Sequence, residues 1–420
     1  MKKNLRRVFI IFLCISVGWT LGYLRLPYIE NKQAYWIGFL ACLVIVLLLI
    51  SLLYIWNQNK ILHRTIGKSE EVKSISKSYR LVRNLILGLV VIGAVIGSIA
   101  FGVQNKKFKG EIDRKDKIIL DQAQVIDSLS GRNVGALLSG IIEDVRQDVN
   151  SDSSRTISTY LISWISEYSF SLKPYVYPEG DSLSIHPLSP ERGLLLKALL
   201  YLDINPNQLA KIIANTTFEA ADLRGANLAG KVLSGIDLYR ADLSKANLSG
   251  TILYDANLTR ANLKGTNLNQ SDLSEATLVR ADLNWALMND ADLSFANLDG
   301  ADLSFSQMSR AQLVNAKIRW ANMTGAIVAG ADLQNCNIFT TNLSYSNFTG
   351  ADLNGAILRK SIFEETILTG VDLENAEVES GWLERLAKWK TIGGKKIQSN
   401  YITTQSGTVK IPKYFLKSLD

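Results

Sequence analysis

Large apolar side chains occur at every fifth position from Phe218 to Val378, without a single insertion or deletion. The pattern comprises 33 consecutive repeats, and the residue two positions before each large side chain is usually Ala, Ser or Thr. A period of five matches neither an α-helix nor a β-strand. We interpret each repeat as small-inward, polar-outward and large-inward residues, followed by two residues that turn a corner. Repetition at this short, fixed period predicts a solenoid over residues 216–380.

The large inward side chains are predicted to form the core of this solenoid, in ladders packed against the small inward residues. Lys231 stands where a small inward residue is expected, and Ile236 and Val371 are oversized for such a position. Because these positions lie near the two ends of the repeat region, we attribute them to end effects. The core residues that we predict are Phe218, Leu223, Leu228, Leu238, Leu258, Leu278, Leu298, Leu333, Leu353 and Leu373.

Residues 221–225 (ADLRG) and 226–230 (ANLAG) resemble the pentapeptide-repeat family, and the resemblance extends over 165 of the 420 residues. It implies a mainly β fold, a right-handed quadrilateral β-helix with four repeats in each coil. It also implies that the repeats themselves hold no catalytic centre. With about 4.8 Å between stacked strands, a little over eight coils would give a rod roughly 40 Å long.

Three uncharged apolar runs precede the repeats, and we predict that residues 8–24, 36–56 and 85–103 are transmembrane helices of a membrane region 1–103. At about 1.5 Å per residue, the run 36–56 is long enough for a hydrocarbon core of about 30 Å. The first run follows four basic residues and has the alternative of being a cleaved signal peptide, although we favour an uncleaved span. The expected location is therefore the cell membrane, with several passes and the lipid bilayer as a partner.

Basic residues leave the sidedness of the solenoid open. Seven Lys and Arg residues in 57–84 and four before the first run favour a cytoplasmic location for both segments, against two in 25–35. Six basic residues in 104–117 would then lie outside, which opposes this topology.

Residues 104–215 are expected to form a polar stalk and a helical lead-in that caps the solenoid. Apolar residues at steps of three and four from Val134 to Val149 predict an amphipathic helix, and residues 156–171 predict a second one. Ser189 before Pro190 is typical of a helix start, and a short helix is expected over residues 206–214. Residues 188–193 (LSPERG) resemble the lead-in segment of some bacterial membrane-associated pentapeptide-repeat proteins.

Residues 381–420 are expected to cover the last coil, whose unpaired backbone would otherwise promote aggregation. Apolar residues at 382, 383, 386 and 389 share one face of a predicted short helix. Residues 401–404 and 408–411 predict a hairpin that turns at Ser406-Gly407.

Charge and composition argue against several classes of function. The formal charge of +7 arises in residues 1–117 and in the tail, whereas residues 216–380 carry −8, so nucleic acid is an unlikely partner. Three Cys occur without the spacing of a metal site or disulfide framework, and the two His are 123 positions apart. We therefore expect no enzyme activity, no cofactor, no metal and no catalytic residues.

With twenty residues per coil, residues twenty apart stack into columns on the surface. One column contains acidic side chains at 272, 292, 332, 352 and 372, which we interpret as stabilisers of the local turns. Another column is basic and aromatic. It is a candidate docking surface for an acidic partner. The alternative is that its side chains are solvated and balance the charge of nearby Asp residues. The candidate partner-binding stripe consists of Tyr239, Arg240, Arg260, Arg280, Arg319, Trp320, Phe339, Arg359 and Lys360.

The function that we predict is a non-catalytic, membrane-tethered scaffold or protein-binding module with an unidentified protein partner. One alternative comes from the family resemblance: an acidic solenoid that imitates DNA and binds a topoisomerase, which the modest charge and the basic stripe disfavour. The other alternative is a subunit of a membrane channel or transport assembly. Because the three predicted spans contain no charge, that role would require a homo-oligomer.

Overall fold

The computed structural model describes residues 117–124, 134–151, 156–179, 182–183, 186–202, 204–408 and 411–419, with the single residues 106, 110, 114 and 126. The predicted spans 8–24, 36–56 and 85–103 lie outside these residues. Within the part of the chain that the structure describes, no helix combines the length and apolarity needed to cross a bilayer. The chain divides into two compact units, of which the second, Asp116–Asp420, contains the repeats.

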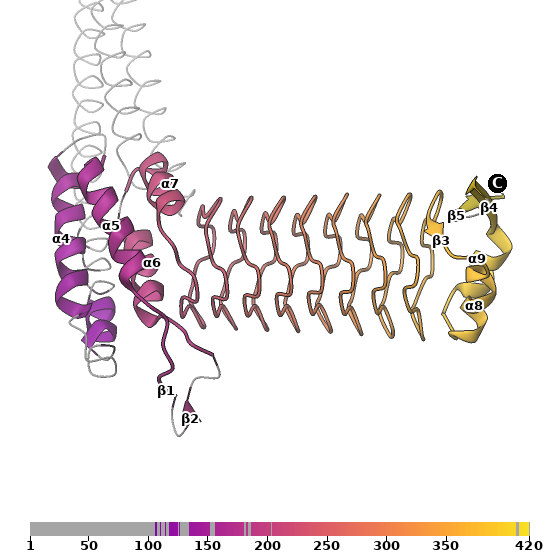
Figure 1. Cartoon of the computed structure of the whole chain (residues 1–420), viewed down its shortest axis with the longest axis horizontal. Helices are drawn as coiled ribbons and strands as arrows, with labels where there is room; N and C mark the ends of the chain where they lie inside the picture. Colours follow the sequence, from indigo (N-terminus) through magenta and orange to yellow (C-terminus); the bar gives the residue numbers. More distant parts are fainter. Residues whose placement is uncertain are drawn as a thin grey trace, which may run out of the picture. The chain divides into compact units, whose positions relative to one another are not determined.

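The repeats form a β-helix with four sides and twenty residues per coil (Figure 1). Asp222 forms a parallel bridge with Asp242, and the same offset recurs up to the bridge between Ile357 and Glu377. Between successive coils, the Leu223 N–H donates to the Asp242 carbonyl at 2.8 Å, and the Asp242 N–H donates to the Ala221 carbonyl at 3.0 Å. The coil of four pentapeptides that the family resemblance implied is therefore confirmed.

Most corners of the coil are tight turns closed by one backbone hydrogen bond. The Ala226 N–H donates to the Leu223 carbonyl at 3.0 Å, and the residue before Ala226, Gly225, has a φ of 61°. Every fifth residue from Ala220 to Asn375 adopts this left-handed conformation, which glycine tolerates best. Most of these corners carry other residues, so the ladder between coils enforces a backbone that their side chains disfavour.

Polar side chains of the repeats are largely engaged within the solenoid. The outward Asp or Asn commonly accepts a hydrogen bond from the N–H two residues later, as Asp242 does from Ser244 at 2.9 Å. All five carboxylates of the acidic column accept such a bond, which supports their interpretation as turn stabilisers. Inward Thr and Ser donate to the backbone instead, as Thr251 does to Leu228 at 2.9 Å.

The apolar core is continuous from the N-terminal helices to the C-terminal cap. Each of the ten predicted core residues exposes at most 2% of its surface. The three exceptional inward positions lie near the ends, as expected: Lys231 donates to the carbonyl of Leu200 at 3.3 Å, while Ile236 and Val371 are buried.

Helices α4 (Val134–Ser151), α5 (Thr159–Ser171), α6 (Pro190–Tyr201) and α7 (Pro206–Asn215) precede the solenoid. A small hairpin, β1 (Pro178–Glu179) with β2 (Ser182–Leu183), lies between α5 and α6. Ser189 is the N-cap of α6, because its Oγ accepts from the Arg192 N–H at 3.2 Å, and Pro190 occupies the first helical position.

The C-terminal cap consists of β3 (Glu377–Val378), α8 (Trp382–Lys388), α9 (Gly394–Asn400), β4 (Tyr401–Thr408) and β5 (Ile411–Ser418). Strand β5 pairs with both β3 and β4, so the hairpin covers the backbone of the last coil. The predicted turn at Ser406-Gly407 is wrong, because β4 continues to Thr408, which pairs with Ile411.

Candidate functional site

The lead-in segment supplies the first layer of the solenoid on one face. Ser189 forms a parallel bridge with Ala221, as a residue of a preceding coil would. Its N–H donates to the carbonyl of Ala220 at 2.7 Å, and its carbonyl accepts from the Asp222 N–H at 3.1 Å. The start of α6 is therefore held to the first coil by backbone hydrogen bonds.

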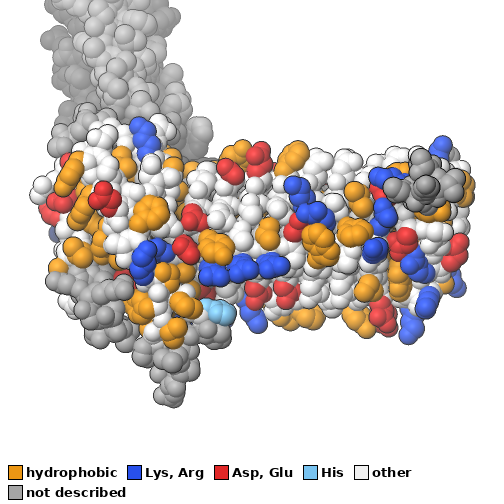
Figure 2. Space-filling view, in the orientation of Figure 1, with side chains coloured by type: hydrophobic (Ala, Val, Ile, Leu, Met, Phe, Trp, Pro, Cys, Tyr) orange, Lys and Arg blue, Asp and Glu red, His pale blue; other side chains and the backbone are white. Residues whose placement is uncertain are grey.

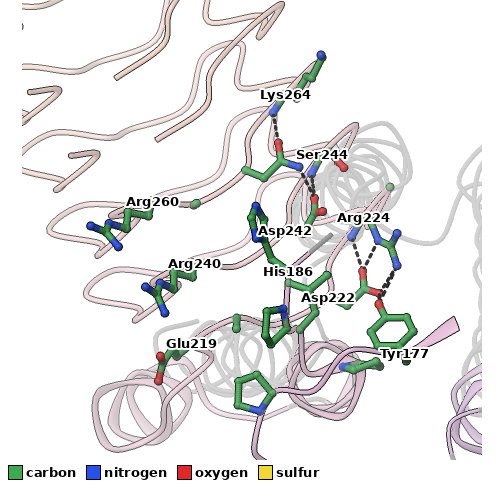
Figure 3. A pocket seen from close by; sticks show the side chains of 18 of the residues that line it. Tyr177, His186, Glu219, Asp222, Arg224, Arg240, Asp242, Ser244, Arg260 and Lys264 are labelled. Carbon is green, nitrogen blue, oxygen red and sulfur yellow. Dashed lines mark hydrogen bonds and ion pairs between the residues drawn. The ribbon is translucent and has the colours of Figure 1, made fainter. Parts of the chain in front are cut away.

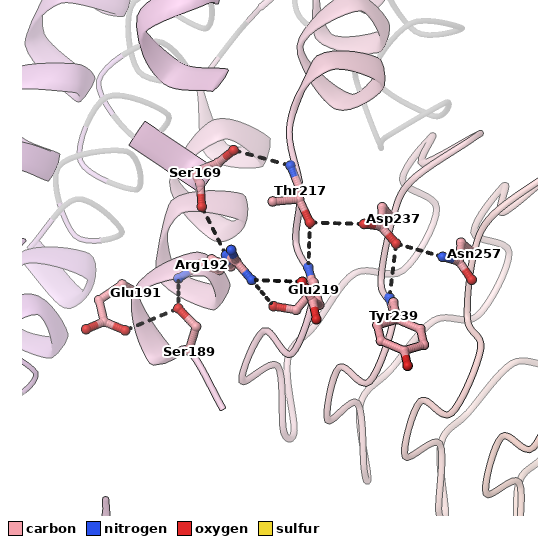
Figure 4. A network of polar contacts seen from close by, with 9 residues as sticks. All are labelled: Ser169, Ser189, Glu191, Arg192, Thr217, Glu219, Asp237, Tyr239 and Asn257. Carbon is pink, nitrogen blue, oxygen red and sulfur yellow. Dashed lines mark hydrogen bonds and ion pairs between the residues drawn. The ribbon is translucent and has the colours of Figure 1, made fainter. Parts of the chain in front are cut away.

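Arg192 ties the helices to the first coil from a buried position (Figure 4). Its Nε donates to the carbonyl of Ser169 in α5 at 3.0 Å, and one terminal nitrogen donates to the carbonyl of Glu219 at 2.6 Å. Burial lowers the pKa of this guanidinium, while the carboxylates of Glu219, Asp237 and Glu191 oppose the change. A buried cation of this kind depends on its acceptors, so the network fixes the lead-in in one place.

A second network, formed by Tyr177, Asp222 and Arg224, lies beside the first (Figure 3). Arg224 donates to both carboxylate oxygens of Asp222, at 2.9 and 2.6 Å, and to the hydroxyl of Tyr177 at 2.8 Å. The Tyr177 hydroxyl donates to Asp222 in turn. Burial favours a raised pKa for Asp222, but hydrogen bonds from Arg224 and Tyr177 outweigh it and hold the pKa below its usual range. This carboxylate is thus ionised and fully engaged.

The lead-in and the first coils enclose a cleft of about 1530 Å³. The lead-in contributes a wall that is largely apolar, with Pro174, Pro187, Leu188 and Leu194. The opposite wall comes from successive coils, on which Arg240 and Arg260 point in the same direction (Figure 3). Figure 2 shows a row of basic side chains that runs along the solenoid on the side nearest the lead-in.

The carboxylates of the cleft are engaged by neighbouring groups. Asp222 binds Arg224, Glu219 lies 3.9 Å from Arg192, and Asp242 accepts hydrogen bonds from Ser244 and Asn262. Asp282 accepts one from the N–H of Asn284. The acidic groups are therefore held within the fold.

The cations of the cleft are not engaged in this way. Within the described ranges, six of them form no salt bridge: Lys197, Arg240, Lys245, Arg260, Lys264 and Arg280. Arg224 is the seventh basic residue in the lining, which with four acidic ones gives a local formal charge of +3. This charge contrasts with the −8 of residues 216–380.

Lys197 occupies the lead-in side of the cleft, on helix α6. Burial lowers its pKa, while the carboxylate of Asp222 opposes the change and the guanidinium of Arg224 adds to it. A half-buried ammonium without a salt bridge costs free energy that a bound anion would offset.

The nine residues of the predicted stripe separate into two groups. Arg240, Arg260 and Arg280 line the cleft, and the guanidinium of Arg240 lies 5.2 Å from the ring centre of Tyr239. The remaining five lie further along the solenoid and are largely engaged with one another or with acids. Arg319 binds Asp299, Arg359 binds Glu377, Arg319 stacks on Trp320, and Lys360 lies over Phe339.

A comparison with protein families matches the solenoid to the one described as pentapeptide repeats. Eight copies match, over residues 218–255, 251–290, 286–325, 310–338 and 336–375. The solenoid belongs to the pentapeptide-repeat family.

Solved structures of pentapeptide-repeat proteins are similar to the solenoid. HetL from the cyanobacterium Nostoc sp. strain PCC 7120, involved in heterocyst differentiation regulation, is 27% identical, with 39% of this chain and 83% of HetL covered and a TM-score of 0.22. Full-length QnrB1, a plasmid-mediated fluoroquinolone resistance protein, is 22% identical over 40% of this chain and 95% of its own, with a TM-score of 0.21. Rfr23 from the cyanobacterium Cyanothece 51142 is also 22% identical, over 40% and 90%, with a TM-score of 0.21. Comparison with curated proteins gave no match.

The pentapeptide-repeat solenoid also exposes aromatic side chains at its corners. Trp285 and Phe305 stack with ring centres 4.8 Å apart and planes at 12°, and they expose 57% and 44% of their surfaces. The column spacing of twenty residues predicts this pair.

The repeat pattern does not predict the place of Lys197 or of the apolar wall in the cleft, because both belong to the lead-in. In the ranges given above, no three His, Cys, Asp or Glu side chains are placed to hold a metal ion.

Proposed function

We propose that this pentapeptide-repeat protein is a non-catalytic, membrane-tethered binding module that holds a protein partner against the first coils of its solenoid. The observation that carries the proposal is the cleft, where carboxylates are engaged within the fold, while six cations form no salt bridge with any described residue. Cations without a salt bridge favour a partner of opposite charge, because complementary electrostatic potentials guide the association and set the orientation of the partner.

The construction of the solenoid suits this role. Consecutive coils are joined by parallel ladders, and its two ends are covered by the helical lead-in and by the C-terminal hairpin. A surface fixed in this way loses little conformational entropy when a partner binds, which favours affinity. The three uncharged runs at 8–24, 36–56 and 85–103 support the proposed tether.

Two experiments with the full chain test the proposal. Membrane fractionation should recover the protein with the bilayer, and protease accessibility in sealed vesicles should identify the side that the solenoid occupies. An affinity pull-down from solubilised membranes should recover a partner that is lost on combining Arg240→Glu with Arg260→Glu. Lys317→Glu is the matched control, because Lys317 is also exposed on the solenoid but lies outside the cleft.

Unchanged partners in the double variant would overturn the binding role. A soluble full-length protein in the absence of detergent would overturn the tether. If the solenoid were a DNA mimic, replacing Arg with Glu should strengthen partner binding, because the substitutions would make the surface more negative and closer to that of DNA. Inhibition of a topoisomerase that strengthens in the double variant would favour that alternative.

A further inference from the structure

The arginine column places three like charges in a stack. Arg240, Arg260 and Arg280 occupy the same corner of successive coils, and neighbouring coils are about 4.8 Å apart. Like charges carried on corners this close together repel one another. Each of the three also adopts a left-handed backbone, with φ between 57° and 59°. The fold thus tolerates two unfavourable features along this column, repulsion between like charges and a left-handed backbone. A bound anion would relieve the repulsion.

We propose that the cleft binds an extended acidic segment of a partner protein, along the column from Arg240 to Arg280. This inference rests on the proposed function and specifies its partner. The column extends over two coil steps, about 10 Å, which equals three or four residues of extended chain at about 3.3 Å each. Carboxylates on two alternate residues of this stretch, about 6.6 Å apart, would then face the three arginines.

The size and the second wall of the cleft favour a peptide over a smaller anion. Its volume of about 1530 Å³ exceeds the roughly 300–1,000 Å³ of typical small-molecule pockets. The lead-in wall includes the side chains of Pro174, Pro187 and Pro190, which are not buried and offer contact area to the opposite edge of an extended chain. An isolated phosphate would leave this wall uncovered. Lys197 lies on the same side and provides a cation at the end nearest the helices.

The test is a titration of the full chain, in detergent micelles, with a fluorescein-labelled peptide of about eight glutamates, long enough to cover the column at about 3.3 Å per residue. Fluorescence anisotropy should show saturable binding that weakens as ionic strength rises from about 0.05 to 0.5 M, because added salt screens exposed charges. The triple variant Arg240→Glu, Arg260→Glu and Arg280→Glu should bind at least roughly tenfold more weakly, since each lost pair contributes a severalfold change.

Single variants provide a matched comparison. Arg260→Glu should weaken binding, while Lys317→Glu, which changes the net charge equally, should leave it unchanged. Circular dichroism melts should show no variant less stable than the native chain, because these side chains lie outside the core and Arg260→Glu relieves repulsion between like charges. A triple variant that melts early is replaced by Arg260→Gln, which keeps a polar side chain and should still lower the affinity.

Three outcomes would overturn the inference: no binding of the peptide by the native protein, equal binding by the triple variant, or displacement of the peptide by inorganic phosphate at matched charge concentration. Stronger binding of anionic phospholipid vesicles or duplex DNA than of the peptide would also overturn it. If the peptide does not bind but recovery of the pull-down partner still depends on Arg240 and Arg260, the inference of an extended acidic segment is wrong and the proposed binding role remains. If the pull-down is also unaffected, the proposed function fails with it.

Discussion

Gly193 is the position at which the docking of the lead-in on the solenoid can be tested most sharply. It lies in helix α6, facing the first coil, and a Cβ added to it would collide with the backbone of Asp222. The collision is with the carbonyl oxygen, and the carbonyl carbon would lie only 2.8 Å away. Because these atoms belong to the bridged ladder, they cannot move aside cheaply. The variant Gly193→Ala should therefore push α6 away from the first coil.

The magnitude follows from the contacts that this movement breaks. The two backbone hydrogen bonds of Ser189 are worth about 1 kcal/mol each, and those of the buried Arg192 about 1.5–3 kcal/mol because the donor is charged. Replacing glycine with alanine inside a helix gains about 0.8–1 kcal/mol, which offsets part of the loss. Relaxation within the helix would keep some contacts, so the free energy of opening should fall by about 2–4 kcal/mol.

Amide hydrogen exchange is the suitable assay, because it reports on local opening. Peptides containing the amides of Ser189 and Asp222 should exchange roughly 30- to 1,000-fold faster in Gly193→Ala, since each 1.4 kcal/mol corresponds to a factor of ten. Peptides from the middle of the solenoid should exchange as in the native chain.

Gly140→Ala is the matched control. Gly140 lies in helix α4, and a Cβ added there would meet nothing within 4 Å. That variant should be neutral or stabilising by up to about 1 kcal/mol. If Gly193→Ala behaves in the same way and leaves the amides of Ser189 and Asp222 protected, the close approach of α6 to the first coil is refuted.

Three further variants address the solenoid itself. Leu298→Ala, at a fully buried position, should lower the free energy of unfolding by about 2–5 kcal/mol in a urea titration, and an unchanged midpoint would contradict an inward Leu298. Burial raises the pKa of the Cys336 thiol far above its usual value. In a variant whose other two cysteines are replaced (Cys14→Ser and Cys42→Ser), iodoacetamide should therefore label Cys336 only after unfolding. Labelling of the folded chain would contradict its burial. Arg280→Gly should change the free energy of unfolding by less than about 1 kcal/mol, because glycine suits the left-handed corner, yet it should weaken peptide binding; a large loss of stability would refute this.

The solenoid could be predicted from the sequence because its determinants are local and repeated. A large residue every fifth position specifies the inward face, and Asp or Asn between the inward pair specifies the turn, as at Asp242 and Ser244. The coil of twenty residues then gives the surface columns directly. The pairing of Arg319 with Asp299, one coil earlier, was available from the same arithmetic, although the stripe grouped Arg319 with the unpaired arginines.

The cleft could not be predicted in this way, because it depends on contacts between segments without a shared period. Arg192 reaches Ser169, 23 residues earlier, through a buried hydrogen bond that no sequence pattern announces. Lys197 lies on a helix whose other residues are largely buried, so its place in the cleft follows only from the docking of α6. The hairpin turn was misplaced for a similar reason: strand pairing extends β4 to Thr408 in spite of the turn-forming Ser406-Gly407.

The central claim, that a protein partner occupies the cleft, is tested most directly by site-specific photo-crosslinking in intact membranes. A photoreactive residue replaces Ser244, which lines the cleft, or Ser294, which has the same local hydrogen bond to Asp292 but lies on the opposite face. Position 244 should give a discrete crosslinked protein that disappears when Arg240→Glu and Arg260→Glu are added, and position 294 should give none. Equal crosslinking from both positions, or crosslinking from 244 that survives the charge reversal, would contradict the claim.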